Sequence, residues 1–411
     1  MKIVLFEIRK NVLKISVLIP MLLLVVINSI MIFLQYRYDQ NPFSDEMNKY
    51  RVSEKEWNYY HELHKKTDGE LTEAKVEYIV DNYNKLYDKI KNDDYSTEYS
   101  DDTCTGYVFG DYSLVKTYFY EPIKYIVTYC KENEKIIEAA GNNITFYEGV
   151  NNKYEVEKNR YIVNQYSGRN PSIFYETTGW KKLLEYNFSD VLMIILIFLC
   201  ILPAFYQERK SGMEDIILSA KKGKKMYIAG KYLAFFVCAA GVCAIFFLSD
   251  YASFSAIYGL NGAQMPIYTI AEYQYTPLNI SVFRMYIVKY ILKCMSFIVI
   301  STIFGLAANL SKNTIMTFLI FLGLTVLGLY CSGFIFSNHV GRLWLAMVSP
   351  FSLMKSQEVF KTLLDVKLFG HFYVRLYVCI VIQLIIESGL LMCSYIHFKM
   401  ISKGSGRRYV Y

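Results

Sequence analysis

Six long apolar stretches constrain this sequence more than any other feature. They cover residues 15–36, 191–207, 232–249, 294–311, 313–341 and 376–398. Across all six, the only Asp, Glu, Lys or Arg is Glu387. A helix needs about 20 apolar residues to cross the ~30 Å hydrocarbon core of a bilayer. A soluble domain would have to bury every side of six such helices, which disfavours that class. The sequence therefore predicts a polytopic α-helical membrane protein with six transmembrane helices.

Charge is distributed unevenly along the chain, and its distribution orients these spans. Residues 36–189 carry 20 basic and 27 acidic side chains, whereas the rest of the chain carries 24 basic and 10 acidic ones. Many basic residues of the remainder flank the spans at alternate ends: Lys2, Arg9, Lys10, Lys14, Arg209, Lys210, Lys221, Lys222, Lys224, Lys225, Lys231, Lys312, Lys399, Lys403, Arg407 and Arg408. Lys and Arg are enriched in cytoplasmic loops. We therefore expect both termini in the cytoplasm and the acidic segment outside it.

The spans divide the chain into seven parts. Residues 1–14 mix apolar and charged side chains, which suits a helix lying in the membrane interface, although a flank that only sets topology would have a similar composition. The expected parts are 1–14 (cytoplasmic interfacial helix), 15–36 (first transmembrane helix), 37–189 (extracellular domain), 190–207 (second transmembrane helix), 208–231 (cytoplasmic loop), 232–398 (transmembrane helices three to six) and 399–411 (cytoplasmic basic tail).

We expect the extracellular part to be a small α+β domain. Apolar residues at three- and four-residue spacings predict a helix over residues 70–91. Runs rich in Tyr, Val and Ile predict extended segments at 107–109, 114–120, 125–129, 144–147 and 161–164. Cys104 and Cys130 could form a disulfide there, or remain two unpaired thiols. Beyond this domain, the amphipathic run 351–369 predicts a surface or re-entrant helix after the fifth span.

Charged residues within or beside the spans are candidates for a role in transport. Glu387 lies midway along the last span, where an ionised carboxylate costs a few kcal/mol or more. It could face a translocation path or a partner helix, or it could be protonated or hydrogen-bonded to Gln383 or Ser388. Three cations precede the fourth span: Arg284, Lys289 and Lys293. We expect these three to extend to the outer headgroups rather than to bind substrate.

The sequence has no motif for catalysis, nucleotide binding or metal binding. Two Gly-Lys pairs, at 223–224 and 230–231, lack the glycine five positions earlier that a phosphate-binding loop requires. The five histidines are scattered, and no Cys/His cluster has zinc-ligand spacing. We expect no catalytic residues, no metal site and no cofactor in this chain, so ATP-driven work would require another chain.

The cytoplasmic loop has an ordered arrangement of residue types. It contains an acidic residue, a glycine four positions later, a short apolar helix, a basic cluster and a final lysine. The residues are Glu208, Gly212, Met213, Ile216, Ile217, Leu218, Lys224, Lys225 and Lys231. The glycine permits a tight turn, and the apolar residues fall largely on one helical face.

This loop resembles the corresponding loop of the type-2 ABC exporter permeases. The resemblance extends to the six spans, the N-terminal helix and the internal termini. The resemblance implies that the apolar helix after Gly212 is a coupling helix that docks on a separate ATPase subunit, which binds ATP and Mg²⁺. It also implies a second permease chain, as a homodimer or heterodimer, in the lipid of a bacterial cell membrane, with no role for nucleic acid. Lys221 and Lys222 depart from the family, which often has proline or an apolar residue there. A large insert between the first two spans occurs in only one subset of such permeases.

The expected function is therefore that of an exporter permease. The external segment holds 22 of the 38 tyrosines and has a net charge of −7, which favours a cationic or amphipathic peptide, for example an antimicrobial one, as substrate. A secondary transporter is one alternative, but it favours intramembrane charges and inverted repeats. A membrane-anchored ligand sensor is another, but it would need a cytoplasmic signalling domain larger than residues 208–231.

Overall fold

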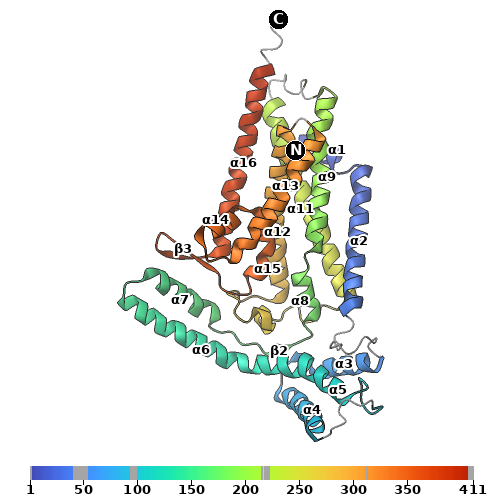
Figure 1. Cartoon of the computed structure of the whole chain (residues 1–411), viewed down its shortest axis with the longest axis vertical. Helices are drawn as coiled ribbons and strands as arrows, with labels where there is room; N and C mark the ends of the chain where they lie inside the picture. The colour runs from blue at the N-terminus through green and yellow to red at the C-terminus, as the bar shows by residue number, and fades with distance from the viewer. Residues whose placement is uncertain are drawn as a thin grey trace.

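The computed structural model describes residues 2–39, 54–92, 100–213, 216, 223–311 and 313–405. Six helices in these ranges are long and apolar enough to cross a membrane, which confirms the predicted fold class. They are α2 (Ile15–Asp39), α9 (Phe188–Lys210), α11 (Gly223–Ile257), α12 (Val282–Leu310), α13 (Thr314–Ser332) and α16 (Arg375–Ser405). In Figure 1 they run along the long axis of the molecule, with both termini toward the upper end. We call that end the terminal end, and the opposite end the insert end.

Helices α9 and α12 form the centre of the bundle. Their most apolar windows are 67% buried, compared with 17% for α2 and α16 and 22% for α13. Phe198 of α9, Phe304 of α12 and Phe321 of α13 join these helices, with ring centroids 4.0 and 4.1 Å apart. Burying one such ring contributes roughly 1.5–3 kcal/mol. The exposed apolar faces of α2, α13 and α16 are left for lipid or a partner chain.

A short helix, α1 (Lys2–Asn11), lies against α9 and α11 at the terminal end. The exposure of its side chains is the reverse of that usual in a soluble protein, because apolar side chains are exposed and a charged one is buried. Leu5 and Phe6 are 60% and 62% exposed, whereas Glu7 is 4% exposed. A helix with this distribution can place its apolar side in the acyl boundary of a bilayer. The interfacial location of residues 1–14 stays a prediction.

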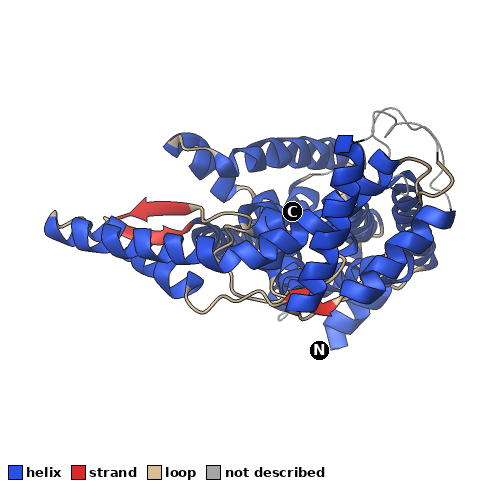
Figure 2. Ribbon diagram, turned by 90° about the horizontal axis from the view of Figure 1, so that it is seen from below, coloured by secondary structure: helices blue, strands red, loops and turns tan. Residues whose placement is uncertain are grey.

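The segment between the first two spans is largely helical and lies across the insert end (Figures 1 and 2). Its elements are α3 (Glu54–Thr67), β1 (Gly69–Glu70), α4 (Glu73–Asn92), α5 (Val108–Val115), the π-helical turn η1 (Lys116–Tyr120), α6 (Glu121–Gly149), α7 (Lys153–Tyr166), β2 (Ile173–Phe174) and α8 (Thr178–Glu185). The predicted helix over residues 70–91 is present as α4. The two-residue antiparallel ladder between β1 and β2 is the only strand pairing among the described residues of this segment.

The strand predictions for residues 107–164 are wrong. Residues 108–149 form one almost continuous helix from α5 through η1 to α6, and 153–166 form α7. The buried positions Val115, Phe119, Ile123 and Ile126 explain this outcome, because they recur every three or four residues. Strand propensity of Tyr, Val and Ile depends strongly on context, and here the helical spacing of the buried face decides.

The connection between α13 and α16 folds back into the bundle. Its elements are η4 (Gly333–Phe336), α14 (Val340–Val348), η5 (Pro350–Lys355), α15 (Ser356–Val359), β3 (Asp365–Leu368) and β4 (His371–Val374). Ser296 of α12 donates to the Pro350 carbonyl at 2.8 Å, and Gln383 of α16 donates to the Met347 carbonyl at 2.9 Å. The surface or re-entrant helix predicted over 351–369 is therefore wrong, because this run begins with short turns and ends in a hairpin closed by Phe369 and Gly370, both at positive φ.

The insert also contacts this hairpin. Helix α7 packs beside β4, and Figure 2 shows the longer pair of strands next to the insert's helices. Lys158 lies 3.3 Å from Asp365 of β3, and Glu157 accepts hydrogen bonds from the Phe372 N–H at 2.9 Å and from His371 at 2.7 Å. The insert is thus tied to the segment between the last two spans as well as to its own two spans.

The third connection at the insert end joins α11 to α12. It contains two single turns of 3₁₀ helix, η2 (Ile267–Thr269) and η3 (Ala271–Tyr273). They lie between the bundle and the insert. Tyr125 of α6 donates to the Tyr268 carbonyl at 2.7 Å, and Arg169 donates to the Thr276 carbonyl at 2.8 Å.

Candidate functional site

Glu208 ends the second span and is buried despite its charge. It is 4% exposed, and its Oε2 lies 2.7 Å from the Nζ of Lys231, which is 0% exposed. The Oε2 atom of Glu7, on α1, lies 4.0 Å from the same ammonium group. A buried charge is costly unless it is paired and hydrogen-bonded. Glu208 and Lys231 therefore depend on each other.

Three more polar contacts complete this site. Lys10 of α1 and Tyr227 of α11 both donate to Glu208, and Lys231 donates to the Ala204 carbonyl of α9. We call the five side chains at its centre the Glu208 cluster: Glu7, Lys10, Glu208, Tyr227 and Lys231. It joins α1, α9 and α11, so none of these helix ends can move without disturbing the other two.

The cluster closes the base of the predicted cytoplasmic loop. Glu208 and Lys231 are the first and last residues of that loop, and their ion pair brings its two ends together. Gly212 terminates α9 with φ of +67°, and its N–H donates to the Arg209 carbonyl at 3.2 Å. Left-handed glycines commonly end helices in this way because they carry no Cβ. Helix α11 begins at Gly223, so the last part of the expected loop is helical.

Apolar side chains project from this closed loop. Met213 is 49% exposed and Ile216 is 65% exposed. Ile217 and Leu218, the other predicted members of the apolar face, lie outside the described residues. Lys224 and Lys225 belong to the first turn of α11, and their side chains likewise lie outside the described part.

Arg209 links the cluster to a fourth helix, a role that its sequence position did not reveal. Its guanidinium donates to the Ser311 carbonyl at 2.5 Å, and to the Asn309 carbonyl at 2.5 Å and side-chain oxygen at 3.1 Å. These acceptors lie at the end of α12, where carbonyl groups lack partners within the helix. The end of α9 is therefore connected to the α12–α13 turn as well as to α1 and α11.

Glu387 has one satisfied and one unsatisfied oxygen. Thr302 of α12 donates to its Oε1 at 2.7 Å, whereas its Oε2 is buried with no hydrogen-bond partner among the described residues. The alternative in which Gln383 or Ser388 bonds to this carboxylate is not found. Gln383 donates to carbonyls of α14, and Ser388 donates to the Leu384 carbonyl one turn earlier. Glu387 joins α16 to α12, and its functional role stays untested.

The prediction that Lys289 and Lys293 extend to headgroups is wrong. They are 4% and 6% exposed, and Lys293 pairs with Asp190 of α9 at 2.6 Å. Lys289 donates to three carbonyls around the end of α8: those of Leu183, Leu184 and Tyr186, at 3.1, 2.6 and 3.0 Å. These acceptors become available only because α8 ends beside α12, which the sequence does not disclose. Arg284 is exposed, as expected.

Cys104 and Cys130 are not joined by a disulfide in the structure. The Cys104 N–H bonds to Asp111 of α5 at 3.0 Å, while Cys130 lies further along the same helical run and donates to Asn170 at 3.4 Å. At about 1.5 Å per residue, positions 111 and 130 are roughly 28 Å apart. A disulfide requires Cα atoms within about 7 Å.

The described residues contain no cluster of three His, Cys, Asp or Glu side chains that could hold a metal ion. His61 stacks on Trp57, with ring centroids 5.4 Å apart, and the Nδ1 atom of His64 lies 2.8 Å from Asp68. The ring of Tyr60 lies between these two histidines, with its centroid 5.7 Å from that of His61 and 4.6 Å from that of His64.

A protein family described as "ABC-2 family transporter protein" has a model that matches residues 10–366. The matched range contains most of the Glu208 cluster, the loop that it closes and five of the six spans. No curated protein and no solved structure matches the chain significantly.

Proposed function

Because the chain belongs to the ABC-2 family of transporter proteins, and is thus a membrane permease subunit of an ABC transporter, we propose that it exports its substrate with energy from a separate ATPase chain. The observation that carries this proposal is the closure of the loop between α9 and α11 by Glu208 and Lys231. A loop held at both ends transmits force to the helices that hold it, whereas an open loop would bend.

The coupling step follows from this arrangement. The exposed side chains of Met213 and Ile216 would enter an apolar groove of the ATPase, and each buried side chain of this size contributes roughly 1.5–3 kcal/mol. The ATPase would bind ATP and Mg²⁺, and its closure would displace the loop. The Glu208 cluster would then carry the displacement to α1, α9 and α11, and Arg209 would carry it to α12.

Orientation and assembly complete the proposal. The basic flanks support a terminal end in the cytoplasm and an insert outside the cell. Two permease chains, identical or related, would enclose the pathway, with the exposed apolar faces of α2, α13 and α16 available for lipid and for the partner. Glu387 and Thr302 are candidates for a polar contact that changes as the two permeases move against each other.

The experiment is purification of the tagged chain from its native host in mild detergent, followed by reconstitution into lipid nanodiscs. The expected result is a stoichiometric ATP-hydrolysing subunit whose hydrolysis rate falls when Ile216→Asp is introduced and is retained with Ile216→Leu. The proposal would be overturned, in favour of a secondary transporter, by a chain that purifies alone and whose solute transport in proteoliposomes is driven by an ion gradient.

A further inference from the structure

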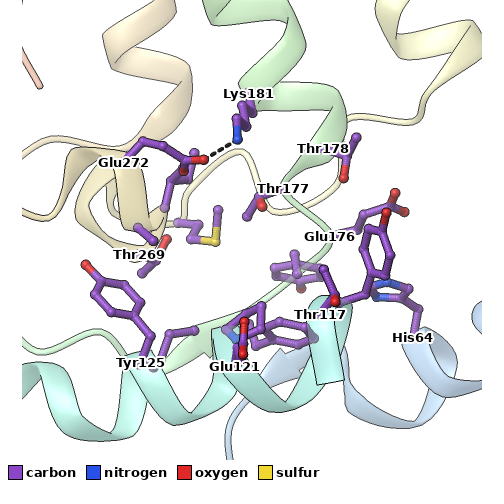
Figure 3. A pocket seen from close by; sticks show the side chains of 18 of the residues that line it. His64, Thr117, Glu121, Tyr125, Glu176, Thr177, Thr178, Lys181, Thr269 and Glu272 are labelled. Atoms are coloured by element: carbon purple, nitrogen blue, oxygen red, sulfur yellow. Dashed lines mark hydrogen bonds and ion pairs between the residues drawn. The ribbon is translucent and has the colours of Figure 1, made fainter. Parts of the chain in front are cut away.

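A cavity of about 480 Å³ lies where the insert meets the bundle. Figure 3 shows its two walls: α3, η1 and α6 of the insert on one side, and α8 with the 265–272 segment on the other. Ligand pockets in proteins commonly measure about 300–1,000 Å³. The cavity is therefore large enough for a small molecule or for one or two side chains of a peptide.

The charged side chains that line the cavity are predominantly acidic. Glu121 comes from α6, Glu176 from the link between β2 and α8, and Glu272 from η3 (Figure 3). Lys181 of α8 is the only Lys or Arg in the lining, and it is paired with Glu272. Glu121 has a loose contact with Lys116 at 3.8 Å. The lining thus favours a positively charged occupant.

Aromatic rings supply the apolar part of the lining. Four phenol rings line the cavity: Tyr60 from α3, Tyr118 from η1, Tyr125 from α6 and Tyr175 from the link between β2 and α8. Burial raises the pKa of both Tyr60 and Tyr125, so these phenols are neutral at physiological pH. Neutral aromatic faces attract ammonium and guanidinium groups and also accept apolar side chains.

A buried histidine provides an independent sign of a missing partner. His64 lines the cavity, is 6% exposed, and its Nδ1 lies 2.8 Å from Asp68. Its Nε2 is buried with no hydrogen-bond partner among the described residues. A buried ring nitrogen without a hydrogen-bond partner carries a desolvation cost. A ligand with a polar group that reached Nε2 would remove this cost.

We propose that the cavity binds a guanidinium or ammonium group next to an apolar group, as found in a cationic amphipathic peptide. The acidic lining selects the cation, the tyrosine faces accept both the cation and the apolar group, and the unpaired Nε2 of His64 offers a polar contact. This proposal rests on the proposed export function in one respect only, namely the inference that the bound peptide is the exported substrate.

Fluorescence anisotropy with the full-length protein in nanodiscs, without nucleotide, tests this proposal. The probe is N-acetyl-Phe-Arg β-naphthylamide, compared with analogues of similar size in which citrulline or Glu replaces Arg. We expect the Arg probe to bind at least tenfold more tightly than either analogue. Equal binding of all three would overturn the proposal.

Variants then assign the binding to the cavity. Glu121→Gln with Glu176→Gln should weaken the Arg probe at least tenfold, whereas Glu132→Gln with Glu134→Gln, on an exposed part of α6, should not change it. Thr117→Trp, which fills the cavity without changing its charge, should also weaken binding. Unchanged affinity in both cavity variants would overturn the proposal. Because no ATP is present, loss of ATPase coupling would leave these results unaffected, so the two proposals fail separately.

Discussion

Lys231 Nζ lies 2.7 Å from Glu208 Oε2, although the two residues stand at opposite ends of the loop that joins α9 to α11. Neither residue is more than 4% exposed. The pair joins the two ends of the loop to each other, and Lys10 adds the N-terminal helix to the same cluster. This relationship determines which substitutions should uncouple the transporter and which should only destabilise it.

Glu208→Ala should lower the free energy of unfolding by about 3–5 kcal/mol, because it leaves Lys231 buried without its main counter-charge. The double variant Glu208→Met with Lys231→Met should recover much of that loss, since it removes both charges. Thermal unfolding in nanodiscs measures both. Glu132→Ala, which breaks the exposed pair with Lys135, should change stability by no more than about 1 kcal/mol. Equal effects of Glu208→Ala and Glu132→Ala would contradict the role of the buried pair.

Gly212→Ala should reduce coupling through backbone strain rather than through a clash. A Cβ at Gly212 would meet nothing within 4 Å, but the residue has φ of +67°, which costs a non-glycine residue roughly 1–2 kcal/mol. We expect weaker association with the ATPase subunit and partial rescue by Gly212→Asn, which tolerates this conformation. Gly241→Ala, in the middle of α11 and also without close neighbours, serves as the control and should leave association unchanged. If both alanine variants behaved alike, the turn would have no special role.

Lys293→Met should destabilise the protein by about 3–5 kcal/mol because it strands Asp190 in the bundle. Arg284→Met, about two and a half turns earlier and exposed, should cost less than about 0.5 kcal/mol. Chemical unfolding of the two variants under identical lipid conditions gives the comparison. Small and similar effects of the two variants would contradict the role of the Lys293–Asp190 pair and would favour side chains of Lys293 and Arg284 that both extend to lipid headgroups.

The contact between the insert and the β3–β4 hairpin should weaken in acid. Hydrogen bonds from the Phe372 N–H and then from His371 hold the pKa of Glu157 below its ordinary value of 4.5. A lowered pKa in the folded state means that the stabilisation is present above pH 4.5 and is lost as the pH falls through the lower, folded value. The protection factor of the Phe372 amide, which is the intrinsic exchange rate at each pH divided by the observed rate, should therefore fall below about pH 4.5, and Glu157→Gln should flatten this dependence. An unchanged pH profile in the variant would exclude Glu157 as the cause.

Hydrophobicity alone predicts the six spans, because five charge-free runs of 17 or more residues, and a sixth run interrupted only by Glu387, have few structural alternatives to membrane helices. The positions of Glu208, Gly212 and Lys231 along the loop also follow from the sequence. Their meeting in one buried cluster does not, since it depends on how α9 and α11 pack. Sequence reasoning noted Lys10 and Lys231 as flanking or terminal basic residues, but it gave no signal for Tyr227 or for the capping role of Arg209.

The insert illustrates the opposite case. Tyrosine- and valine-rich runs suggested strands, yet Val115, Phe119 and Ile123 keep the spacing of a buried helical face. Counting that spacing across the whole of residues 108–149 would have predicted the helix. The cavity near His64 could not be predicted in any such way, because its walls come from segments on both sides of the second span.

Photo-crosslinking from position 216 tests the central claim most directly. The exposed Ile216, replaced by a benzophenone amino acid, should form an adduct with the ATPase subunit in native membranes. The same replacement at Tyr87, an exposed residue of the insert, should form none. An adduct from position 216 alone would place the ATPase at the closed loop, as the account predicts. An adduct from position 87, or none from position 216, would contradict it.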